Sequence, residues 1–314
     1  MKFKKPKFWD LKKPNFFSYL LFPFTLIISL NNFFLKFKSK NKNEKIKSIC
    51  IGNIYLGGTG KTPTTVVIYE LLKKLNFKVS TAKKFYTSHK DENLLLEKKT
   101  KFITSDSRNK ILTKGIEEGQ QIIIFDDGLQ DKTISYDIEF VCFDSDSFIG
   151  NGFLIPAGPL REKLKSLNKY DAVFLKNNNN NIQEQVNLIR KFNSNIKIFE
   201  TYFEITNLDK FNLDDKFIIF SGIGNPKNFK KILIDHKIKV VKEIIFADHY
   251  NYKRKEIEKI LSLAKKNNFK IITTEKDFMK INKFNLDNVN FIQLNLRIKN
   301  EKQLLDFLKN KIYE

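Results

Sequence analysis

The residue types best suited to chemistry form one glycine-rich run between an apolar segment and a helix-like segment: Gly57, Gly58, Thr59, Gly60, Lys61 and Thr62. Glycines let successive backbone N–H groups turn toward one phosphate, and the start of the following helix adds partial positive charge. The Lys61 ammonium can reach the outer phosphates, and the Thr62 hydroxyl can ligate Mg²⁺. The run predicts a nucleotide-binding phosphate loop that uses ATP and Mg²⁺.

The loop is a variant of the common pattern, because Tyr55 stands where a glycine is expected five residues before Gly60. It is closer to the G-G-x-G-K-T form of partition and septum-site ATPases, although those proteins carry a signature lysine where this chain has Leu56. An accidental glycine turn is the simpler alternative. That alternative does not explain why a lysine and a threonine follow the glycines in register.

Two acids, Asp126 and Asp127, end an apolar run that predicts a buried strand. In a P-loop fold, the Mg²⁺-side aspartate lies at the carboxyl end of a parallel strand beside the loop. The alternative is an acidic turn that only caps a strand. Residues 150–162 contain three glycines and two prolines and end in Arg161 and Glu162. Long loops in compact domains are often functional, so these two residues join the candidates.

Apolar segments alternate with helix-like segments along the chain. Strands are predicted at 48–51, 78–82, 121–127, 139–144 and 171–175, and a second series at 217–220, 240–241, 270–273 and 290–294. In the helix after the loop, Val67, Leu71 and Leu75 recur at i+4 and predict a core-facing stripe. The pattern predicts an α/β fold with a variant P-loop NTPase domain and a second, smaller α/β domain. The predicted division is 1–44, 45–200 and 201–314.

The amino-terminal segment has no charged residue between Lys13 and Lys36, and residues 16–30 are almost wholly apolar. This stretch approaches the ~20 residues that cross a bilayer. Pro23 in its middle and lysine-rich flanks on both sides favour instead a membrane-associated helix that lies in the interface. A buried core helix is the alternative. A cleaved signal peptide is less expected, since no small-residue cleavage site follows.

Composition limits the classes of protein that remain. The hydrophobic content of 41% in 314 residues excludes global disorder and is enough for two cores. The net charge of +22 fits nucleic acid, an anionic membrane or a phosphorylated substrate, although abundant Lys, Asn, Ile and Phe indicate a biased composition with many solvated lysines. The isolated Cys50 and Cys142 match no metal spacing and predict core thiols in a reducing compartment.

In order and spacing, these motifs resemble the tetraacyldisaccharide 4′-kinase family over essentially the whole chain. The segments that carry the resemblance are Phe8-Trp9, Gly52-Asn53, Gly57 to Pro63, Asp126-Asp127-Gly128-Leu129-Gln130, Gly150-Asn151-Gly152, Leu154 to Glu162, Phe220 to Pro226, Asp248-His249 and Thr273 to Asp277. The resemblance implies phosphoryl transfer from Mg-ATP to the 4′-hydroxyl of a lipid A disaccharide 1-phosphate. It also implies monotopic docking of the amino-terminal helix on the cytoplasmic leaflet of the inner membrane, and no nucleic-acid partner.

The resemblance also implies a role for each candidate residue. By motif position, the phosphates are held by the loop with Lys61 and Arg161, and the metal side comprises Thr62, Asp126, Asp127 and Glu162. Asp91 matches the acid that accepts the proton of the sugar hydroxyl, and His249 matches its histidine partner; taken alone, a single histidine is more often structural. Phosphoryl transfer needs positioning, charge neutralisation and one proton acceptor, which this set supplies.

The chain departs from the family pattern at two loops. Asp131-Lys132 stands where the family usually has His-Arg, and Lys84-Phe85-Tyr86 replaces an arginine-glycine-tyrosine stretch. Both changes bear on contacts with the substrate head group. Two other classes remain open on the residues alone: a partition-type or metal-chaperone P-loop ATPase at the membrane, and a membrane-associated binding module without catalysis.

Overall fold

The computed structural model describes residues 5–34, 43–85, 90–131, 133–177, 180–248 and 250–314. Its contacts form two compact units, the first drawn from Met1–Tyr86, Leu96–Tyr202 and Arg297–Glu314, the second from Thr87–Leu95 and Phe203–Leu296. The chain contributes Thr87–Leu95 to the second unit, enters it again at Phe203, close to the boundary expected near Glu200, and returns to the first at Arg297, whereas the prediction placed all of 201–314 in one domain. The α/β prediction itself is confirmed.

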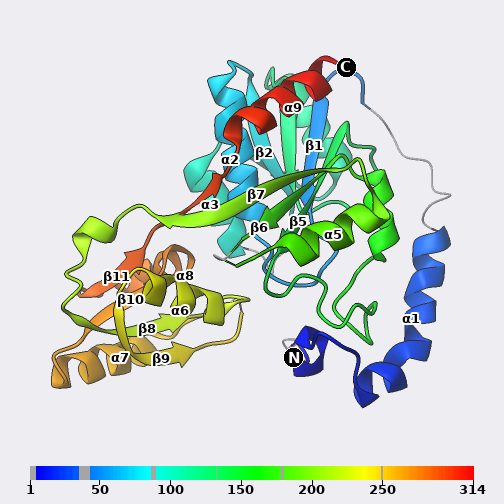
Figure 1. The fold of residues 1–314 in the computed structure, drawn as a ribbon. Coiled ribbons are helices and arrows are strands. Elements are labelled where there is room, and N and C mark those ends of the chain that lie inside the picture. Colours follow the sequence, from blue (N-terminus) through cyan, green and yellow to red (C-terminus); the bar gives the residue numbers. More distant parts are fainter. Residues whose placement is uncertain (1–4, 35–42, 86–89, 132, 178–179, 249) are drawn as a thin grey trace. The chain divides into compact units, whose positions relative to one another are not determined.

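The first unit is built on an eight-stranded sheet with the order β12-β7-β6-β5-β1-β4-β2-β3 (Figure 1). Its strands are β1 (Lys47–Gly52), β2 (Val79–Lys84), β3 (Phe102–Ser105), β4 (Ile122–Asp126), β5 (Ile138–Asp144), β6 (Ala172–Lys176), β7 (Lys197–Ile205) and β12 (Leu294–Ile298). From β7 to β3 every neighbouring pair runs parallel. All these carboxyl ends therefore open on one edge of the sheet.

Helices connect successive parallel strands, as such pairing requires, and others precede β1 or follow β12. They are η1 (Lys7–Asp10), α1 (Phe16–Phe34), α2 (Lys61–Lys74), α3 (Lys90–Lys99), α4 (Arg108–Glu117), η3 (Leu164–Lys169), α5 (Gln183–Phe192) and α9 (Glu301–Tyr313). Among the described residues, no helix combines the length and the apolar character that crossing a membrane takes.

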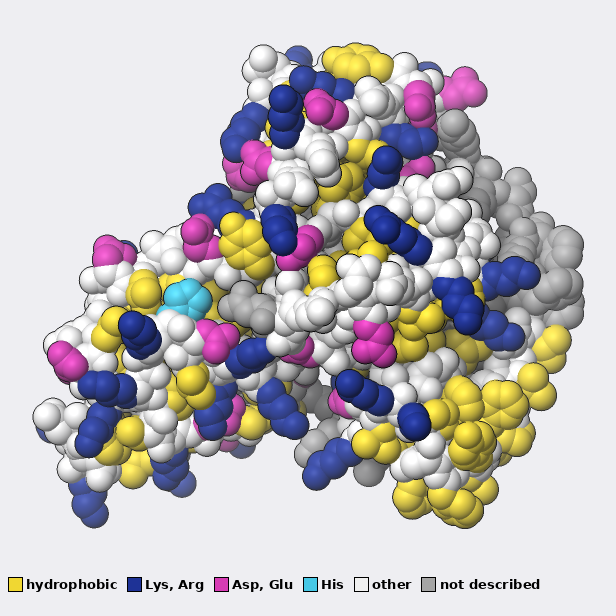
Figure 2. All heavy atoms as spheres, in the orientation of Figure 1, with side chains coloured by type: hydrophobic (Ala, Val, Ile, Leu, Met, Phe, Trp, Pro, Cys, Tyr) yellow, Lys and Arg dark blue, Asp and Glu magenta, His cyan; other side chains and the backbone are white. Residues whose placement is uncertain are grey.

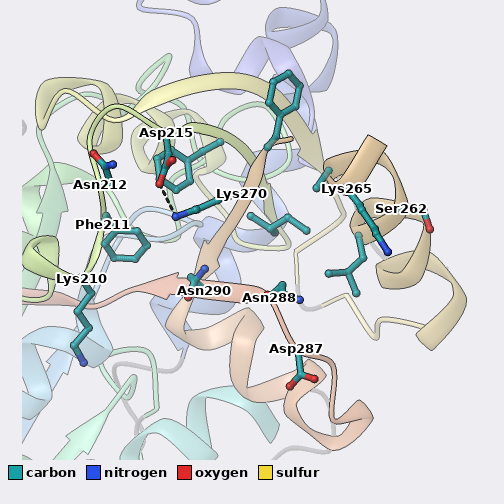
Figure 3. A pocket seen from close by; sticks show the side chains of 15 residues that line it. Lys210, Phe211, Asn212, Asp215, Ser262, Lys265, Lys270, Asp287, Asn288 and Asn290 are labelled. Atoms are coloured by element: carbon teal, nitrogen blue, oxygen red, sulfur yellow. Dashed lines mark ion pairs between the residues drawn. The ribbon is translucent and has the colours of Figure 1, made fainter. Parts of the chain in front are cut away.

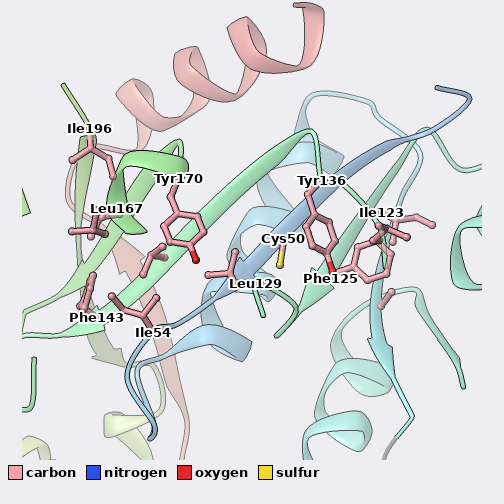
Figure 4. Packing of buried hydrophobic residues seen from close by; sticks show 14 of the residues in the cluster. Cys50, Ile54, Ile123, Phe125, Leu129, Tyr136, Phe143, Leu167, Tyr170 and Ile196 are labelled. Atoms are coloured by element: carbon pink, nitrogen blue, oxygen red, sulfur yellow. The ribbon is translucent and has the colours of Figure 1, made fainter. Parts of the chain in front are cut away.

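Two apolar layers cover the two faces of this sheet, because alternate strand residues point to opposite sides. In β4, Ile123 and Phe125 join one layer with Cys50 and Tyr136 (Figure 4), while Ile122 and Ile124 join the other. Both cysteines are free and buried, as predicted, one in each layer. Burial raises the pKa of Cys142 to about 12, so that thiol is inert at neutral pH.

The stripe predicted on α2 is displaced around the helix. Ile68, Leu71 and Leu72 are fully buried, whereas Val67 and Leu75 are only partly buried beside them. A helix packed flat on a sheet buries a face that includes both i+3 and i+4 neighbours, and here that face is centred on Ile68 and Leu72. The predicted stripe of i+4 steps from Val67 to Leu75 therefore runs along the edge of this buried face.

The second unit has a four-stranded parallel sheet in the order β11-β10-β8-β9. Its elements are η4 (Leu208–Lys210), β8 (Lys216–Ser221), α6 (Pro226–Asp235), β9 (Lys239–Ile245), α7 (Arg254–Lys266), β10 (Lys270–Thr274), α8 (Glu275–Ile281), η5 (Asn282–Phe284) and β11 (Val289–Ile292). One apolar cluster includes Ile257 and Ile260 of α7, and another includes Phe229 and Leu233 of α6. This is the second α/β layer structure that the alternation predicted.

The amino-terminal segment of the first unit is seated on the loop that follows β5. The Trp9 indole is 1% exposed and donates to the carbonyl of Pro156 at 3.0 Å. The backbone N–H of Asn151 donates to the Trp9 carbonyl at 3.0 Å. Gly150 has a φ of +56°, and a Cβ placed there would lie 2.1 Å from that carbonyl oxygen. Only glycine fits this contact.

We expect Gly150→Ala to dislodge Trp9, because the added methyl group collides with backbone and a positive φ disfavours alanine. Trp9 is the only tryptophan of the chain, so the fluorescence emission reports whether its indole stays buried. Exposure of the indole to water should shift the emission to longer wavelength. Gly152→Ala is the matched control: its φ is also positive, at +79°, but the nearest atom to its Cβ is 3.9 Å away. Equal emission from the two variants would contradict the steric argument.

Candidate functional site

The glycine-rich run forms a loop between β1 and α2, at the carboxyl edge of the first sheet. Gly60 is the N-cap residue of α2 and has a φ of +87°, a left-handed conformation that glycine adopts without strain. A Cβ on Gly58 would meet no described atom within 4 Å, so the outer side of the loop is open. Backbone N–H groups at the start of α2 can therefore receive an anion there.

Asn53 braces this loop from inside. Its side chain is fully buried, and its amide nitrogen donates to the Gly57 carbonyl and to the Thr59 hydroxyl, each at 3.1 Å. The sequence motif Gly52-Asn53 pointed to this position, but not to its role. The brace holds the loop in one shape before any ligand arrives, which lowers the conformational entropy that binding must overcome.

Asp126 ends β4 beside the loop and is completely buried. Its Oδ2 accepts from the Thr62 hydroxyl at 2.8 Å and from the Lys83 ammonium at 2.8 Å. Its Oδ1 is buried and has no hydrogen-bond partner among the described residues. A hydroxyl beside a carboxylate with one uncommitted oxygen is a donor set that fits Mg²⁺, a cation that prefers oxygen ligands and retains bound water.

Lys83 was not among the predicted site residues. Its side chain is 3% exposed at the carboxyl end of β2. β4 lies between β1 and β2, so Asp126 faces Thr62 on one side and Lys83 on the other. The strand sequence Val-Ser-Thr-Ala-Lys-Lys gave no signal that separated Lys83 from the many other lysines of the chain, although a lysine is rarely buried without a charged partner.

Asp127 follows with a φ of +65°, which turns its carboxylate toward the loop side of the sheet edge. Lys61 Nζ lies 3.7 Å from its Oδ2, and Arg161 Nη1 lies 3.3 Å from its Oδ1. Burial alone would raise the pKa of Asp127, but the charges of Lys61, Arg161 and Lys83 outweigh it and lower that pKa to about 2. The structure thus brings together five predicted residues from distant segments: Lys61, Thr62, Asp126, Asp127 and Arg161.

Glu162 lies in the same region, but its carboxylate is already engaged. Its Oε1 accepts from Gln130 and from the Tyr170 hydroxyl, each at 3.0 Å. Gln130 in turn accepts from Arg161 at 3.1 Å. In the part of the chain that is described, no cluster of three His, Cys, Asp or Glu residues could hold a metal ion. A metal role for Glu162 stays a prediction.

The Asp131 departure from the family pattern has a structural explanation. Asp131 pairs with Arg108, a residue that is 4% exposed at the start of α4 and also donates to the Asp127 carbonyl at 2.7 Å. Asp131 thus helps to fix the backbone at the second site acid. Lys132 lies outside the described residues.

The predicted acid and histidine pair is not described. Asp91 lies in α3, but its side chain falls outside the described part of the structure, as does the whole of His249. The neighbouring Asp248 carboxylate lies 3.9 Å from the Lys276 ammonium within the second unit. The pairing of Asp91 with His249 therefore stays a prediction.

A separate cavity of about 730 Å³ lies in the second unit and contains none of the predicted residues. Figure 3 shows Asp215 and Lys270 paired in it, with a distance of 2.7 Å between the charged atoms. Lys270 begins β10, so the cavity opens at the amino ends of the strands. Ligands of open parallel sheets bind at the opposite edge, so we assign no role to it.

The low pKa of Asp127 predicts how stability depends on pH. A carboxylate with a folded pKa near 2 and an unfolded pKa of ~3.9 contributes fully above pH ~4 and loses its contribution as the pH falls toward 2. We expect the parent protein to exceed Asp127→Asn in unfolding free energy by about 2 kcal/mol more at pH 5 than at pH 2. Urea unfolding of both proteins across this range measures it, with Asp209→Asn as an exposed control. A pH-independent difference would contradict the assignment.

The family model described as tetraacyldisaccharide-1-P 4′-kinase matches residues 17–313. A tetraacyldisaccharide 4′-kinase of Pelagibacter ubique (strain HTCC1062) is 45% identical over 310 residues, covering 98% of both chains. One of Rickettsia bellii (strain OSU 85-389) is 36% identical over 293 residues, covering 88% of this chain and 89% of the relative.

Among solved structures, the chain is similar to LpxK from Aquifex aeolicus, an "apo" form in complex with ATP. The TM-score is 0.70 at 23% identity, over 94% of this chain and 99% of that one. This likeness supports the fold, and the family match together with the identity to relatives over nearly the whole chain supports the lineage. The chain belongs to the tetraacyldisaccharide-1-P 4′-kinase family.

Proposed function

We propose that the chain transfers the γ-phosphate of ATP to the 4′-hydroxyl of a tetraacyldisaccharide 1-phosphate, with the residues of the phosphate loop as its nucleotide site. Membership of the family makes the chain an ATP-dependent kinase with an alcohol acceptor, in lipid A biosynthesis. The ATPase alternative is not favoured by that membership. The assignment of individual residues and the membrane association are our proposals.

The observation that carries the residue assignment is the meeting of Lys61 and Thr62 with Asp126 and Asp127 at one sheet edge. Lys61 is placed to exchange its contact with Asp127 for the outer phosphates, and Arg161 to neutralise charge on the group in transfer. Thr62 and Asp126 would hold Mg²⁺, which neutralises charge on the β- and γ-phosphates when bound. Lys83 would then orient the Asp126 carboxylate from the far side.

For the acceptor, Asp91 would take the proton of the sugar hydroxyl and His249 would orient that carboxylate. A carboxylate of pKa ~4 is a weak base for an alcohol, so a partner and exclusion of water help it. The support for these two roles is their position in family motifs of this sequence. No nucleic-acid partner enters this proposal.

The membrane association rests on the surface of α1. Among the α1 side chains that the structure describes, nine large apolar ones are 46–75% exposed, and they gather in one patch (Figure 2): Phe16, Phe17, Tyr19, Leu20, Phe22, Phe24, Leu26, Ile27 and Leu30. In contrast, Ser18 and Thr25 are buried, at 0% and 4%. A helix that faces water shows the opposite pattern, with polar side chains exposed and apolar side chains buried. Apolar residues between basic flanks suit the cytoplasmic leaflet of the inner membrane, entered from one side.

The kinase proposal is tested with purified protein, Mg-ATP and a tetraacyldisaccharide 1-phosphate in detergent. We expect ADP release that depends on the acceptor, and a mass increase of one phosphate on the disaccharide. Lys61→Ala should lower kcat by at least about a hundredfold, because the lost charge matters most in the transition state. Asp91→Asn should lower kcat with little change in ATP affinity.

The control is Lys110→Ala, which removes a lysine of an exposed ion pair in the same unit. Acceptor-independent turnover would indicate the ATPase alternative, and no turnover the binding module. Near-parental kcat of Lys61→Ala would remove the nucleotide-site assignment.

The membrane proposal is tested by flotation with vesicles that contain anionic phospholipid. We expect the parent protein to float at low salt, and Leu20→Glu with Ile27→Glu to abolish flotation, because charges at these exposed positions cannot enter the apolar interface. The matched control places the same charges at Ile234 and Val241, which are 53% and 44% exposed in the second unit. Flotation retained by the α1 variant, or lost equally by the control, would contradict the proposal.

A further inference from the structure

Tyr55 occupies the position where the common phosphate loop has glycine, and the structure gives it a specific place. Its ring is 1% exposed and packs with Leu154 and Leu160. A Cβ added to Gly57 would lie 2.9 Å from the Tyr55 ring. The tyrosine is thus a wedge directly against the backbone of the phosphate loop.

The hydroxyl of this wedge is held by the amino-terminal segment. It donates to Asp10 Oδ1 at 2.5 Å and accepts from Lys5 Nζ at 2.9 Å, while Lys5 also donates to Asp10 at 2.7 Å. The three groups form a closed hydrogen-bonded ring, the tyrosine clamp. Burial and then the bond to Asp10 raise the pKa of Tyr55 well above its usual value, so the hydroxyl keeps its proton to donate.

The segment that holds the clamp is itself fixed. Trp9, next to Asp10, is buried in its seat on the loop after β5. The amide of Asn151 donates to the Ser18 hydroxyl of α1 at 2.9 Å. The tyrosine clamp, the buried Trp9 and the start of helix α1 thus lie within fourteen residues of the chain, from Lys5 to Ser18.

The backbone beside Tyr55 leads in turn to the site. Leu56 donates to the carbonyl of Pro159 at 2.8 Å, and Arg161 donates to the carbonyl of Ile54 at 2.7 Å. Arg161 is the residue whose guanidinium contacts Asp127. A shift of Tyr55 therefore reaches both the phosphate loop and a cation of the site.

We propose that Tyr55 is a positioning residue for the phosphate loop, held in place by Lys5 and Asp10, so that ATP affinity depends on the amino-terminal segment. The inference rests on the proposed nucleotide site and extends it to residues that do not touch nucleotide. An unclamped tyrosine ring can move away from Gly57, and the loop then loses part of its preorganisation. The loss falls on ATP binding, and it also lowers kcat because Lys61 and Arg161 shift with this backbone.

The competing interpretation is that the clamp only fastens the amino-terminal segment. Both interpretations predict a lower melting temperature when the clamp is cut. They differ in the nucleotide site: a fastening role leaves ATP affinity unchanged, whereas a positioning role weakens it.

The test measures ATP binding by calorimetry and the KM for ATP and for acceptor, in Tyr55→Phe, Asp10→Ala and the double variant. Loss of one such hydrogen bond should raise Kd and KM for ATP about five- to tenfold and lower kcat, with the acceptor KM within about twofold of the parent. The double variant should be no worse than Tyr55→Phe, because both substitutions cut the same ring. Asp10→Glu, which keeps the carboxylate, should restore part of the affinity.

Two controls match these substitutions. Tyr69→Phe removes another buried tyrosine hydroxyl with a hydrogen bond, to the N–H of Lys101 at 3.1 Å. Asp106→Ala removes another aspartate paired with lysine at 2.7 Å. Both should keep the parental Kd for ATP. Parental ATP affinity in Tyr55→Phe and Asp10→Ala, with only a lower melting temperature, would overturn the clamp proposal. No ATP binding by the parent protein would overturn the proposed nucleotide site and the clamp with it.

Discussion

The fully buried carboxylate of Asp126 is the constraint around which the rest of the first unit is arranged. An ionised group without contact to water is stable only if partners replace its hydration. The strand order supplies those partners, because β4 lies between β1, which leads to Thr62, and β2, which carries Lys83 near its carboxyl end. Removing either partner would leave a buried charge poorly compensated. The phosphate loop, helix α2 and strand β2 are therefore tied to one carboxylate, and the sheet cannot rearrange at this edge without breaking the tie.

Around Asp126 and Asp127 the positive charges are in excess. Lys61, Lys83, Arg108 and Arg161 all act on the Asp127 carboxyl group and hold its pKa low. Because Asp131 pairs with Arg108, Asp126 and Asp127 face three further cations, Lys61, Lys83 and Arg161, and one positive charge is left for an anionic ligand. This local surplus means more for function than the net charge of +22, much of which belongs to exposed lysines.

The amino-terminal segment connects the exposed apolar surface of α1 to the loop beside the candidate nucleotide site. Its helix α1 presents apolar side chains outward, while the turn before it is seated on the loop that carries Arg161 and Glu162. An enzyme whose acceptor is a lipid must meet both a bilayer and a nucleotide. Under the proposed membrane association, seating α1 on the loop that carries Arg161 would allow one unit to present both surfaces.

The sequence alone predicted the glycine-rich loop, the acid pair at the end of β4 and the α/β character of both units. These features depend on residues close together in the chain: glycines before a helix, acids at the end of a strand, and strand-like segments that alternate with helix-like ones. Lys83 and Arg108 could not be assigned this way, since their partners lie on strands and loops that become neighbours only through sheet order. Asn53 contacts the nearby Gly57 and Thr59, so its motif marked the position although not the role. The same holds for the return of the chain at Arg297 and for the buried face of α2. In the sequence, Tyr55 was only a departure from the glycine of the common phosphate-loop pattern. Only the tertiary structure placed Lys5 and Asp10 against its hydroxyl, because a contact between segments far apart in the chain leaves no local pattern.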